Sequence, residues 1–199
     1  MAAISSVWDT SSGSGLTTAQ TEKLAIIAHG TQTAICYPEV GTFDADVTTG
    51  SDREVAARLW SGTNDGEGRW VVPPLVGRTG GNVIIRLWTV LGVSGSAGEE
   101  VAWAFSADSY GIGETLSASL PNDQTVYQDV SAQVAHVVTA FDITVLAAVF
   151  DQTQSFCFKL ERLSNADARD DYTAGTLYLP KIEAVYTGWG IIASPSAPA

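Results

Sequence analysis

The sequence predicts an all-β protein built as an antiparallel two-sheet sandwich, and three observations lead to this prediction. From residue 31 onward, short runs of Val, Ile, Thr and aromatic residues are separated by Gly-, Asn- and Asp-rich turns about every ten to twenty residues. One of these runs alternates between apolar and other residues, and another is apolar at both parities. The length of 199 residues suits one large sandwich domain.

The segment SFCFKLERL, residues 155–163, shows the clearest alternation. Phe156, Phe158 and Leu160 share one parity, whereas Cys157 and its polar neighbours share the other. Successive side chains of a strand point to opposite faces of the sheet. We therefore expect Phe156, Phe158 and Leu160 to lie in the core.

The run NVIIRLWTVLG, residues 82–92, is apolar at both parities. Val83 and Leu87 fall on one face, while Ile84 and Trp88 fall on the other. Apolar residues on both faces are typical of a strand that is covered on both sides. This run is therefore predicted to be a strand with both faces covered.

The last patterned segment contains a change of parity at Pro180. Leu177 and Leu179 share one parity, and the three apolar residues at alternate positions after Pro180 share the opposite one. A proline cannot donate a ladder hydrogen bond and tends to occupy edges or bulges. A bulge at Pro180 and Lys181 returns five side chains to one face. These five are Leu177, Leu179, Ile182, Ala184 and Tyr186.

The N-terminal segment carries a different pattern. Its first fifteen residues are rich in Ser and Gly and indicate a polar arm. In the following GLTTAQTEKLAIIAHG, Thr17 or Thr18 can cap a short helix that ends at Gly30. An extended KLAIIA is the alternative, because short apolar runs fit either state. The expected parts are an arm with a short helix over residues 1–30, a β-sandwich over 31–187 and a polar tail over 188–199.

The charge composition argues against nucleic-acid binding. The chain has 22 acidic and 10 basic residues and a formal net charge of −12. Its lysines and arginines are scattered singly, whereas proteins that bind nucleic acids cluster them to displace counterions.

Charged residues make up 16% of the chain, against about 25% in an average soluble domain. This shortfall suggests a surface buried against partners, with a Ser-, Thr- and Gly-rich exterior as the alternative.

No secretion signal or membrane span is predicted. The residues after Met1 lack a basic start and an apolar core, and no stretch is apolar over the length of a bilayer. Cys36 and Cys157 lie far apart and form no CxxC pair, which argues against a zinc or thioredoxin-like site. We expect cytoplasmic synthesis and two small buried thiols, with a disulfide as the open alternative.

The acidic segment DARDDYTAG raises the question of a metal site. Asp167, Asp170 and Asp171 precede Tyr172, and this composition is typical of a turn between two strands. A Ca²⁺ loop needs alternating oxygen ligands and a glycine at the sharp turn, which this spacing does not supply. We therefore expect the three carboxylates to shape a turn and bind no metal.

Two further acidic segments match metal loops weakly. In FDADVTTGSDRE, Asp44, Asp46 and Thr48 stand at alternate positions, but Gly50 and Glu54 each fall one place away from the calcium-loop pattern. The segment SGTNDGEG contains an Asp-Gly pair and predicts a hairpin tip. Its polar residues are Asn64, Asp65 and Glu67.

No catalytic constellation emerges from the sequence. His29 falls at the predicted helix end and His136 in the alternating run AQVAHVVTAF, so a structural role is expected for each. The nucleophile motif GxSxG and the phosphate-binding loops are absent. A glycosidase needs two carboxylates, and nothing selects a pair. We expect no enzyme, with no catalytic, cofactor-binding or metal-binding residues.

The tryptophans are predicted to fill the core or an interface, because each buries a large apolar area. A platform for stacking sugars is the alternative. They are Trp8, Trp60, Trp70, Trp88, Trp103 and Trp189.

The order of several of these segments resembles β-sandwich virion proteins of tailed bacteriophages. In those proteins a proline-led strand is followed by a G-x-V-x-W strand, and later by an F-x-L-x-R strand, an Asp-Thr/Tyr turn and a closing strand that ends in Tyr. The corresponding elements here are Pro73 to Trp88, Val101 to Phe105, Phe158 to Arg162, Asp171 to Tyr172, and Leu177 to Tyr186. The resemblance covers about residues 70 to 187 and departs from the pattern at Pro180.

The resemblance implies a jelly-roll-like sandwich in a phage particle, most simply a capsid cement or decoration protein that binds the major capsid protein. Together with the low charged fraction and the net charge of −12, it leads us to expect a homo-oligomer, namely a trimer, on the virion surface. The scattered basic residues and the lack of a long apolar stretch argue against a nucleic-acid or membrane partner. A carbohydrate-binding or receptor-binding fibre module is the second hypothesis. A polysaccharide-degrading enzyme is the third.

Overall fold

The computed structural model describes residues 26–38, 45–48, 54–60, 66–75, 77–110, 120, 123–149 and 154–192. Within these residues the chain forms strands, turns and irregular segments but no helix. The strands are β1 (Ile26–Ile35), β2 (Tyr37–Pro38), β3 (Ala45–Thr48), β4 (Glu54–Trp60), β5 (Gly66–Val72), β6 (Val83–Leu91), β7 (Glu100–Tyr110), β8 (Gln124–Asp129), β9 (Val138–Val145), β10 (Ser155–Arg162) and β11 (Leu177–Ile192). No helix in this part of the chain is long and apolar enough to cross a membrane.

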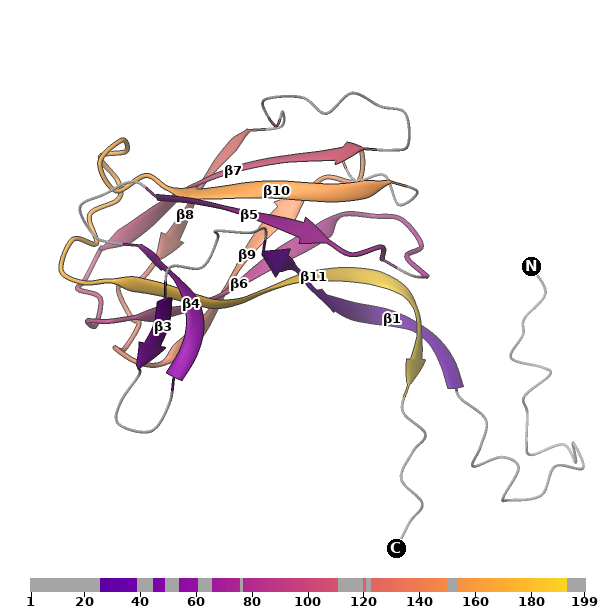
Figure 1. The fold of residues 1–199 in the computed structure, drawn as a ribbon, viewed down its shortest axis with the longest axis horizontal. Coiled ribbons are helices and arrows are strands. Elements are labelled where there is room, and N and C mark those ends of the chain that lie inside the picture. Colours follow the sequence, from indigo (N-terminus) through magenta and orange to yellow (C-terminus); the bar gives the residue numbers. More distant parts are fainter. Residues whose placement is uncertain are drawn as a thin grey trace, which may run out of the picture.

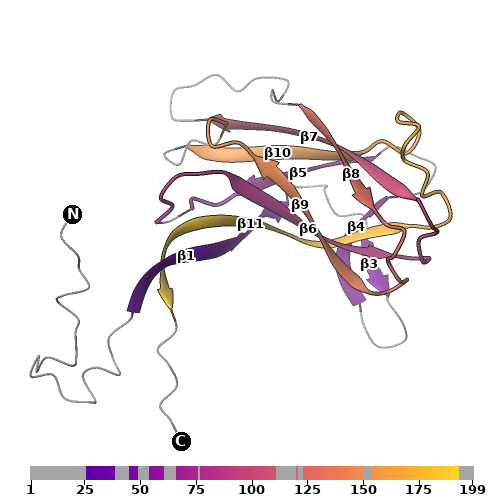
Figure 2. The ribbon, with the colours of Figure 1, turned by 180° about the vertical axis from the view of Figure 1, so that it is seen from behind.

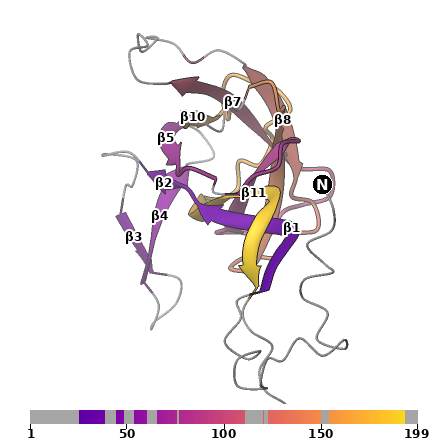
Figure 3. The ribbon, with the colours of Figure 1, turned by 90° about the vertical axis from the view of Figure 1, so that its right-hand side faces the viewer.

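The strands form two sheets packed face to face (Figure 1). Sheet A has the order β3-β4-β11-β6-β9, with β1 also paired to β11, and sheet B has the order β2-β5-β10-β7-β8. In the view turned by 90° (Figure 3), β5, β10 and β7 lie in one layer and β4, β11 and β1 in the other. The predicted all-β, antiparallel two-sheet sandwich is confirmed.

The chain passes repeatedly from one sheet to the other. Between β4 and β11, sheet A receives β4, β6, β9 and β11, and sheet B receives β5, β7, β8 and β10. The resulting orders, 4-11-6-9 and 5-10-7-8, are the connectivity of a jelly roll, in which two interlocked Greek keys share one core.

The core lies between the sheets and is rich in aromatic rings. Phe158 is fully buried on β10, and its ring stacks on Trp70 of β5 at 5.6 Å and on Phe105 of β7 at 5.3 Å between centroids. Phe156 and Leu160 are buried beside it, as the alternation predicts. This core joins the three central strands of sheet B.

A buried polar relay also connects the two sheets. The indole N–H of Trp103 donates to the Gln128 amide oxygen at 3.1 Å, and the Gln128 amide nitrogen donates to the Thr89 hydroxyl at 2.8 Å. Thr89 in turn lies 3.1 Å from the Thr139 hydroxyl. The relay satisfies polar groups that burial would otherwise penalise.

The predicted bulge at Pro180 is confirmed. The pairing of β11 with β6 shifts register between Tyr178 and Lys181. All five residues assigned to one face by the bulge are buried: Leu177, Leu179, Ile182, Ala184 and Tyr186. The extra residue absorbs the parity change that the proline imposes.

Several expectations for the connections need correction. Residues 26–30 belong to strand β1 rather than to a helix, and they pair with residues 188–192 of β11. The remainder of the predicted helix and the first fifteen residues lie outside the described residues. The paired strands thus extend beyond the expected domain limits of 31 and 187. The Asp-Gly segment does not close a hairpin, because β4 before it and β5 after it lie in different sheets.

Candidate functional site

The outer face of sheet A carries the candidate site, on strands β9, β6 and β11. Backbone register aligns these strands in rows: Ala140, Trp88 and Lys181 form one row, and Asp142, Arg86 and Glu183 form the next. Six side chains from three distant parts of the sequence thus meet on one surface. We call this surface the Trp88 face.

Trp88 lies at the centre of the Trp88 face and is half-buried. The Lys181 ammonium nitrogen lies 4.7 Å from the centre of its ring system, within cation–π range. On the other side, the exposed Ala140 leaves space because its side chain is a single methyl group. The Trp88 indole nitrogen is buried and has no hydrogen-bond partner in the described part of the chain. This nitrogen is therefore enclosed by the protein, and other atoms of the Trp88 side chain make up its exposed part.

The second row is an ordered array of charges. Arg86 donates from Nε and Nη2 to the two Asp142 carboxylate oxygens at 2.7 and 2.8 Å, a bidentate pair. The hydrogen bonds that Arg86 donates to Asp142 raise the pKa of Arg86 above its ordinary value, although partial burial opposes the shift. Lys181 forms an ion pair with the nearly buried Glu183. Donors and acceptors are thus held at fixed positions by strand backbone.

Apolar residues surround the charged row. Val90 and Val185 are buried and Ile84 is half-buried, although all three belong to the outer face. At the margin, Ile35 and Val138 are 55% and 51% exposed. The apolar pattern of residues 82–92 predicts that both faces of β6 are covered. The outer face is covered only in part, because Val90 is buried but Ile84 is only half-buried.

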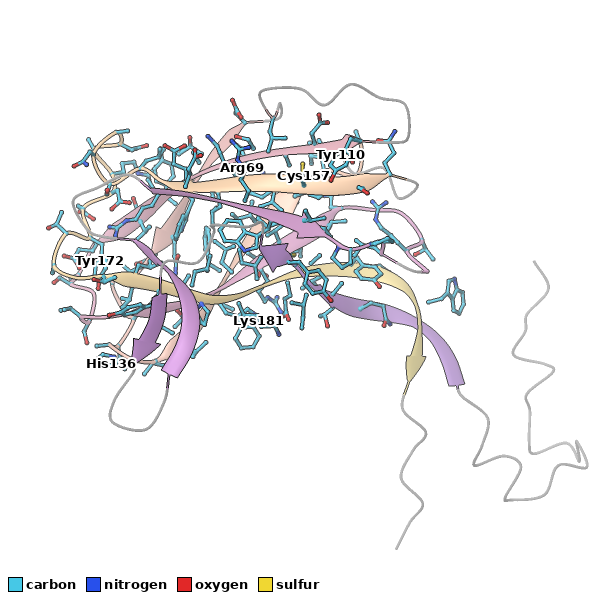
Figure 4. The ribbon with its side chains drawn as sticks, in the orientation of Figure 1. Arg69, Tyr110, His136, Cys157, Tyr172 and Lys181 are labelled. Atoms are coloured by element: carbon cyan, nitrogen blue, oxygen red, sulfur yellow. The ribbon has the colours of Figure 1, made fainter. Side chains whose placement is uncertain are left out.

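The outer face of sheet B is different in character. There Lys159 bridges Glu67 and Glu161 at 3.5 and 3.1 Å, and Arg69 lies on the same face (Figure 4). Figure 4 places Arg69, Cys157 and Tyr110 along this sheet and Lys181 on sheet A. No tryptophan stands on the described part of the sheet B outer face, because Trp70 and Trp103 point into the core.

The structure places the three acids of the segment DARDDYTAG in a turn that is hydrogen-bonded to β7 and β10. Asp167 accepts the Arg169 backbone N–H at 2.9 Å, and Asp171 accepts the Glu100 N–H at 2.7 Å. Asp170 is buried and paired with Arg162. Each carboxylate therefore binds protein groups. Sequence reasoning predicted the turn but not the buried ion pair.

Tyr172 adds two further contacts between the acidic turn and the rest of the sandwich. Its ring lies 5.6 Å from the Arg162 guanidinium carbon, and its hydroxyl donates to the Val93 carbonyl at 2.8 Å. Burial raises the pKa of the Tyr172 hydroxyl above its ordinary value. Arg162 and Tyr172 belong to the motifs that carry the virion resemblance. Their contacts connect β10 to the segment between β6 and β7.

The other acidic segments are only partly described. Asp46 and Thr48 belong to β3 and Glu54 to β4, which pair as neighbours, whereas Asp44 and Gly50 lie outside the described residues. Glu67 belongs to β5, while Asn64 and Asp65 also lie outside. In the described ranges no group of three or more His, Cys, Asp or Glu side chains is placed to hold a metal.

Neither histidine lies where the sequence predicts. His29 belongs to β1 and not to a helix end. His136 lies in an exposed turn rather than in a strand, with a φ of 63°, and its backbone N–H donates to Leu91 at 2.9 Å. A positive φ is unusual for a non-glycine residue and interrupts the alternation there.

Neither Cys36 nor Cys157 forms a disulfide in the described part of the chain. Cys36 is buried where the chain crosses from β1 to β2, and burial raises its pKa to about 12. Cys157 is half-buried on the outer face of sheet B. The expectation of buried thiols is therefore met fully at Cys36 and partly at Cys157.

The tryptophans divide between core and surface. Trp70 and Trp103 are buried, Trp88 is half-buried, and Trp189 is 51% exposed. Trp60 belongs to β4, and Trp8 lies outside the described residues. The sequence indicates that Trp88 lies on the second face of an apolar strand. It does not indicate which residues of β9 and β11 lie beside Trp88.

Comparisons with known proteins found likeness in structure alone. No protein-family model and no curated protein sequence matches the chain. Among solved structures, a xylan-binding module, CBM15, matches with a TM-score of 0.39 and 10% identity over 82% of this chain and 97% of that chain. A structure from work on promiscuous carbohydrate-binding modules of the β-sandwich superfamily matches with a TM-score of 0.33 and 10% identity, over 81% of this chain and 56% of the other.

Proposed function

We propose that the chain is a non-catalytic carbohydrate-binding module and that sugar binds across the Trp88 face. The observation that carries the proposal is the half-buried Trp88 ring, which stands on the outer face of sheet A beside a fixed array of charged groups.

The chemistry of the Trp88 face suits a sugar. A pyranose ring presents apolar C–H groups on one side and hydroxyl groups at its rim, and each hydroxyl both donates and accepts. The exposed part of the indole offers an apolar surface, while Asp142 and Glu183 offer acceptors and Arg86 and Lys181 offer donors. Because these side chains lie on paired strands, the ligand meets a preorganised surface.

The same face is less suited to hydrolysis. A glycosidase needs one carboxyl group that holds a proton and a second that acts as nucleophile or base. Asp142 already forms an ion pair with Arg86, and Glu183 with Lys181, so each carboxylate is engaged by a cation of the protein itself. This arrangement favours binding over the polysaccharide-degrading alternative.

Affinity electrophoresis through gels that contain a panel of soluble polysaccharides tests the proposal. We expect at least one polysaccharide to retard the protein, and Trp88→Ala to weaken binding at least tenfold, which corresponds to about 1.4 kcal/mol. Trp88→Phe keeps an aromatic ring of smaller area, and it should give an intermediate loss. Tyr37→Ala, which removes a 60% exposed aromatic ring on sheet B, is the matched control and should bind normally.

Two results would contradict the carbohydrate proposal. One is no retardation in any gel by a protein whose melting curve shows it to be folded. The other is an equal loss of binding in the Trp88 and Tyr37 variants.

A structural role in a phage virion is the second candidate function. The observation that favours it is the exposed edge of sheet A at β9, flanked by uncovered apolar residues, because such edges commonly pair with other chains. In this role the protein is a cement or decoration protein that binds the major capsid protein. Co-sedimentation with emptied capsids supports the role, while retention on tail structures favours a fibre or receptor-binding position.

A further inference from the structure

Strand β9 forms an open edge of the sandwich. It pairs with β6 along its whole length, and no described strand lies against its other side. Figure 2 shows β9 beside β6, with β8 of sheet B next to it. The sequence VTAFDITV has no proline and no lysine, and its register with β6 runs without a bulge. Edge strands normally carry at least one of these features to prevent pairing.

One hydrogen bond identifies the backbone groups that face the open edge. The Gln124 side-chain amide on β8 donates to the Thr144 carbonyl at 3.3 Å, so this carbonyl points away from β6. Alternate residues of a strand direct their N–H and C=O groups to the same edge. Ala140 and Asp142 therefore present their backbone groups to the open edge, and no described strand receives them.

No charge repulsion between two β9 strands opposes their pairing. Asp142 is the one charged residue of β9, and Arg86 of the same subunit neutralises it through two hydrogen bonds. Two such edges can therefore approach each other without local repulsion, even though the chain carries a net charge of −12.

Exposed apolar residues mark both ends of β9. Of the eight large hydrophobic residues exposed in the described part of the chain, four lie here. Val134, Val137 and Val138 stand at the start of the strand and Leu146 at its end. An antiparallel pair of identical strands brings the start of one strand against the end of the other. The two ends thus complement each other across a two-fold axis, as an isologous interface requires.

We propose that β9 pairs with β9 of a second copy of this chain, antiparallel about a two-fold axis at Phe141. This register sets Ala140 opposite the partner's Asp142 and Val138 opposite the partner's Thr144, and it brings Val137 close to the partner's Leu146. The open backbone groups of Ala140 and Asp142 then close a ladder of hydrogen bonds. A register centred on Asp142 sets two carboxylates opposite each other, which is unfavourable.

The pairing extends sheet A across two subunits and places two Trp88 faces side by side. It does not depend on carbohydrate binding, since β9 contributes its free edge rather than its outer face. A polymer long enough to span both subunits would gain avidity from the second site.

Sedimentation velocity of the full chain over a range of concentrations tests the pairing. We expect a reversible dimer. Ala140→Pro removes an open-edge N–H that β6 does not use, and prolines are tolerated on edge strands. This variant, and the double variant Val138→Lys/Leu146→Lys, should each raise the dissociation constant at least tenfold. Tyr37→Lys places one lysine on a 60% exposed residue of sheet B and should dimerise normally.

Cross-linking tests the register. In the proposed pairing Ala140 and the partner's Asp142 face each other at about 5.5 Å between Cα atoms, within disulfide range. Ala140→Cys/Asp142→Cys should therefore form covalent dimers under oxidation. A monomer at all concentrations, the trimer expected from the virion resemblance, or a dimer that survives both edge variants in folded protein would overturn the proposal. A dimer without cross-linking would overturn the register.

Discussion

The substitution Asp170→Ala is expected to destabilise the sandwich strongly, because it leaves the Arg162 guanidinium buried without a counter-ion. Both side chains are fully buried. Arg162 donates from Nε and Nη2 to the Asp170 carboxylate at 3.0 and 2.6 Å, and the Ala102 backbone N–H donates to the same carboxylate at 3.1 Å. The change therefore leaves one charge and one N–H without their partner.

The magnitude follows from these contacts. Removing one member of a buried ion pair costs about 3–5 kcal/mol, and an unsatisfied buried N–H costs about 1–3 kcal/mol. The two costs overlap, since water entering the vacated space hydrates both groups. We expect the free energy of unfolding to fall by about 4–5 kcal/mol. For a domain of this size the Tm then falls by about 8–20 °C.

Urea unfolding followed by tryptophan fluorescence measures the loss. Asp142→Ala is the matched control, because it removes the same bidentate contact from a pair that is about one-third exposed, and it should cost about 1 kcal/mol or less. The double variant Arg162→Met/Asp170→Leu removes both charges and should lose less than Asp170→Ala. The reasoning fails if Asp170→Ala costs no more than the control, or if the double variant is the less stable.

Three further predictions concern the core, a thiol and the acidic turn. Phe158→Ala should cost about 3–5 kcal/mol of unfolding free energy in urea, because the ring is fully buried between Trp70 and Phe105; a loss under about 1 kcal/mol would contradict the assigned faces of β10. Burial raises the pKa of Cys36 from 9.0 to about 12, so the unfolded chain loses this proton first and stability falls as pH rises through that window. Cys36→Ala should remove up to about 1.4 kcal/mol per pH unit of this slope, and equal slopes in the two proteins would refute the assignment. EDTA should leave the Tm unchanged, since protein groups engage Asp167, Asp170 and Asp171; a Tm lowered by EDTA and restored by Ca²⁺ would show that a metal is bound there.

Local periodicity was a sound guide where one strand face meets the core. The alternation of Phe156, Phe158 and Leu160 and the parity change at Pro180 both matched the structure. These features are readable from sequence because a strand turns each successive side chain to the opposite face, so burial of one face leaves a period of two. The acidic turn was readable for a similar reason, since Asp and Gly favour turns through their own backbone contacts.

Tertiary pairing decided the elements with ambiguous local signals. Residues 26–30 have an apolar pattern that suits a helix or a strand, and partners in residues 188–192 make them a strand. His136 interrupts an alternating run because the chain turns there between sheets A and B. The Asp-Gly segment favours a hairpin locally, yet the strands on either side find their partners in different sheets.

The candidate surfaces depended still more on tertiary structure. Two features follow from the sequence alone: Trp88 stands on the second face of an apolar strand, and β9 contains a single charge. The strand order and register of sheet A then brought Asp142 and Lys181 beside the β6 residues and left β9 at the edge. Strand order arises from packing one shared core between two sheets, a long-range choice that no short stretch of sequence encodes.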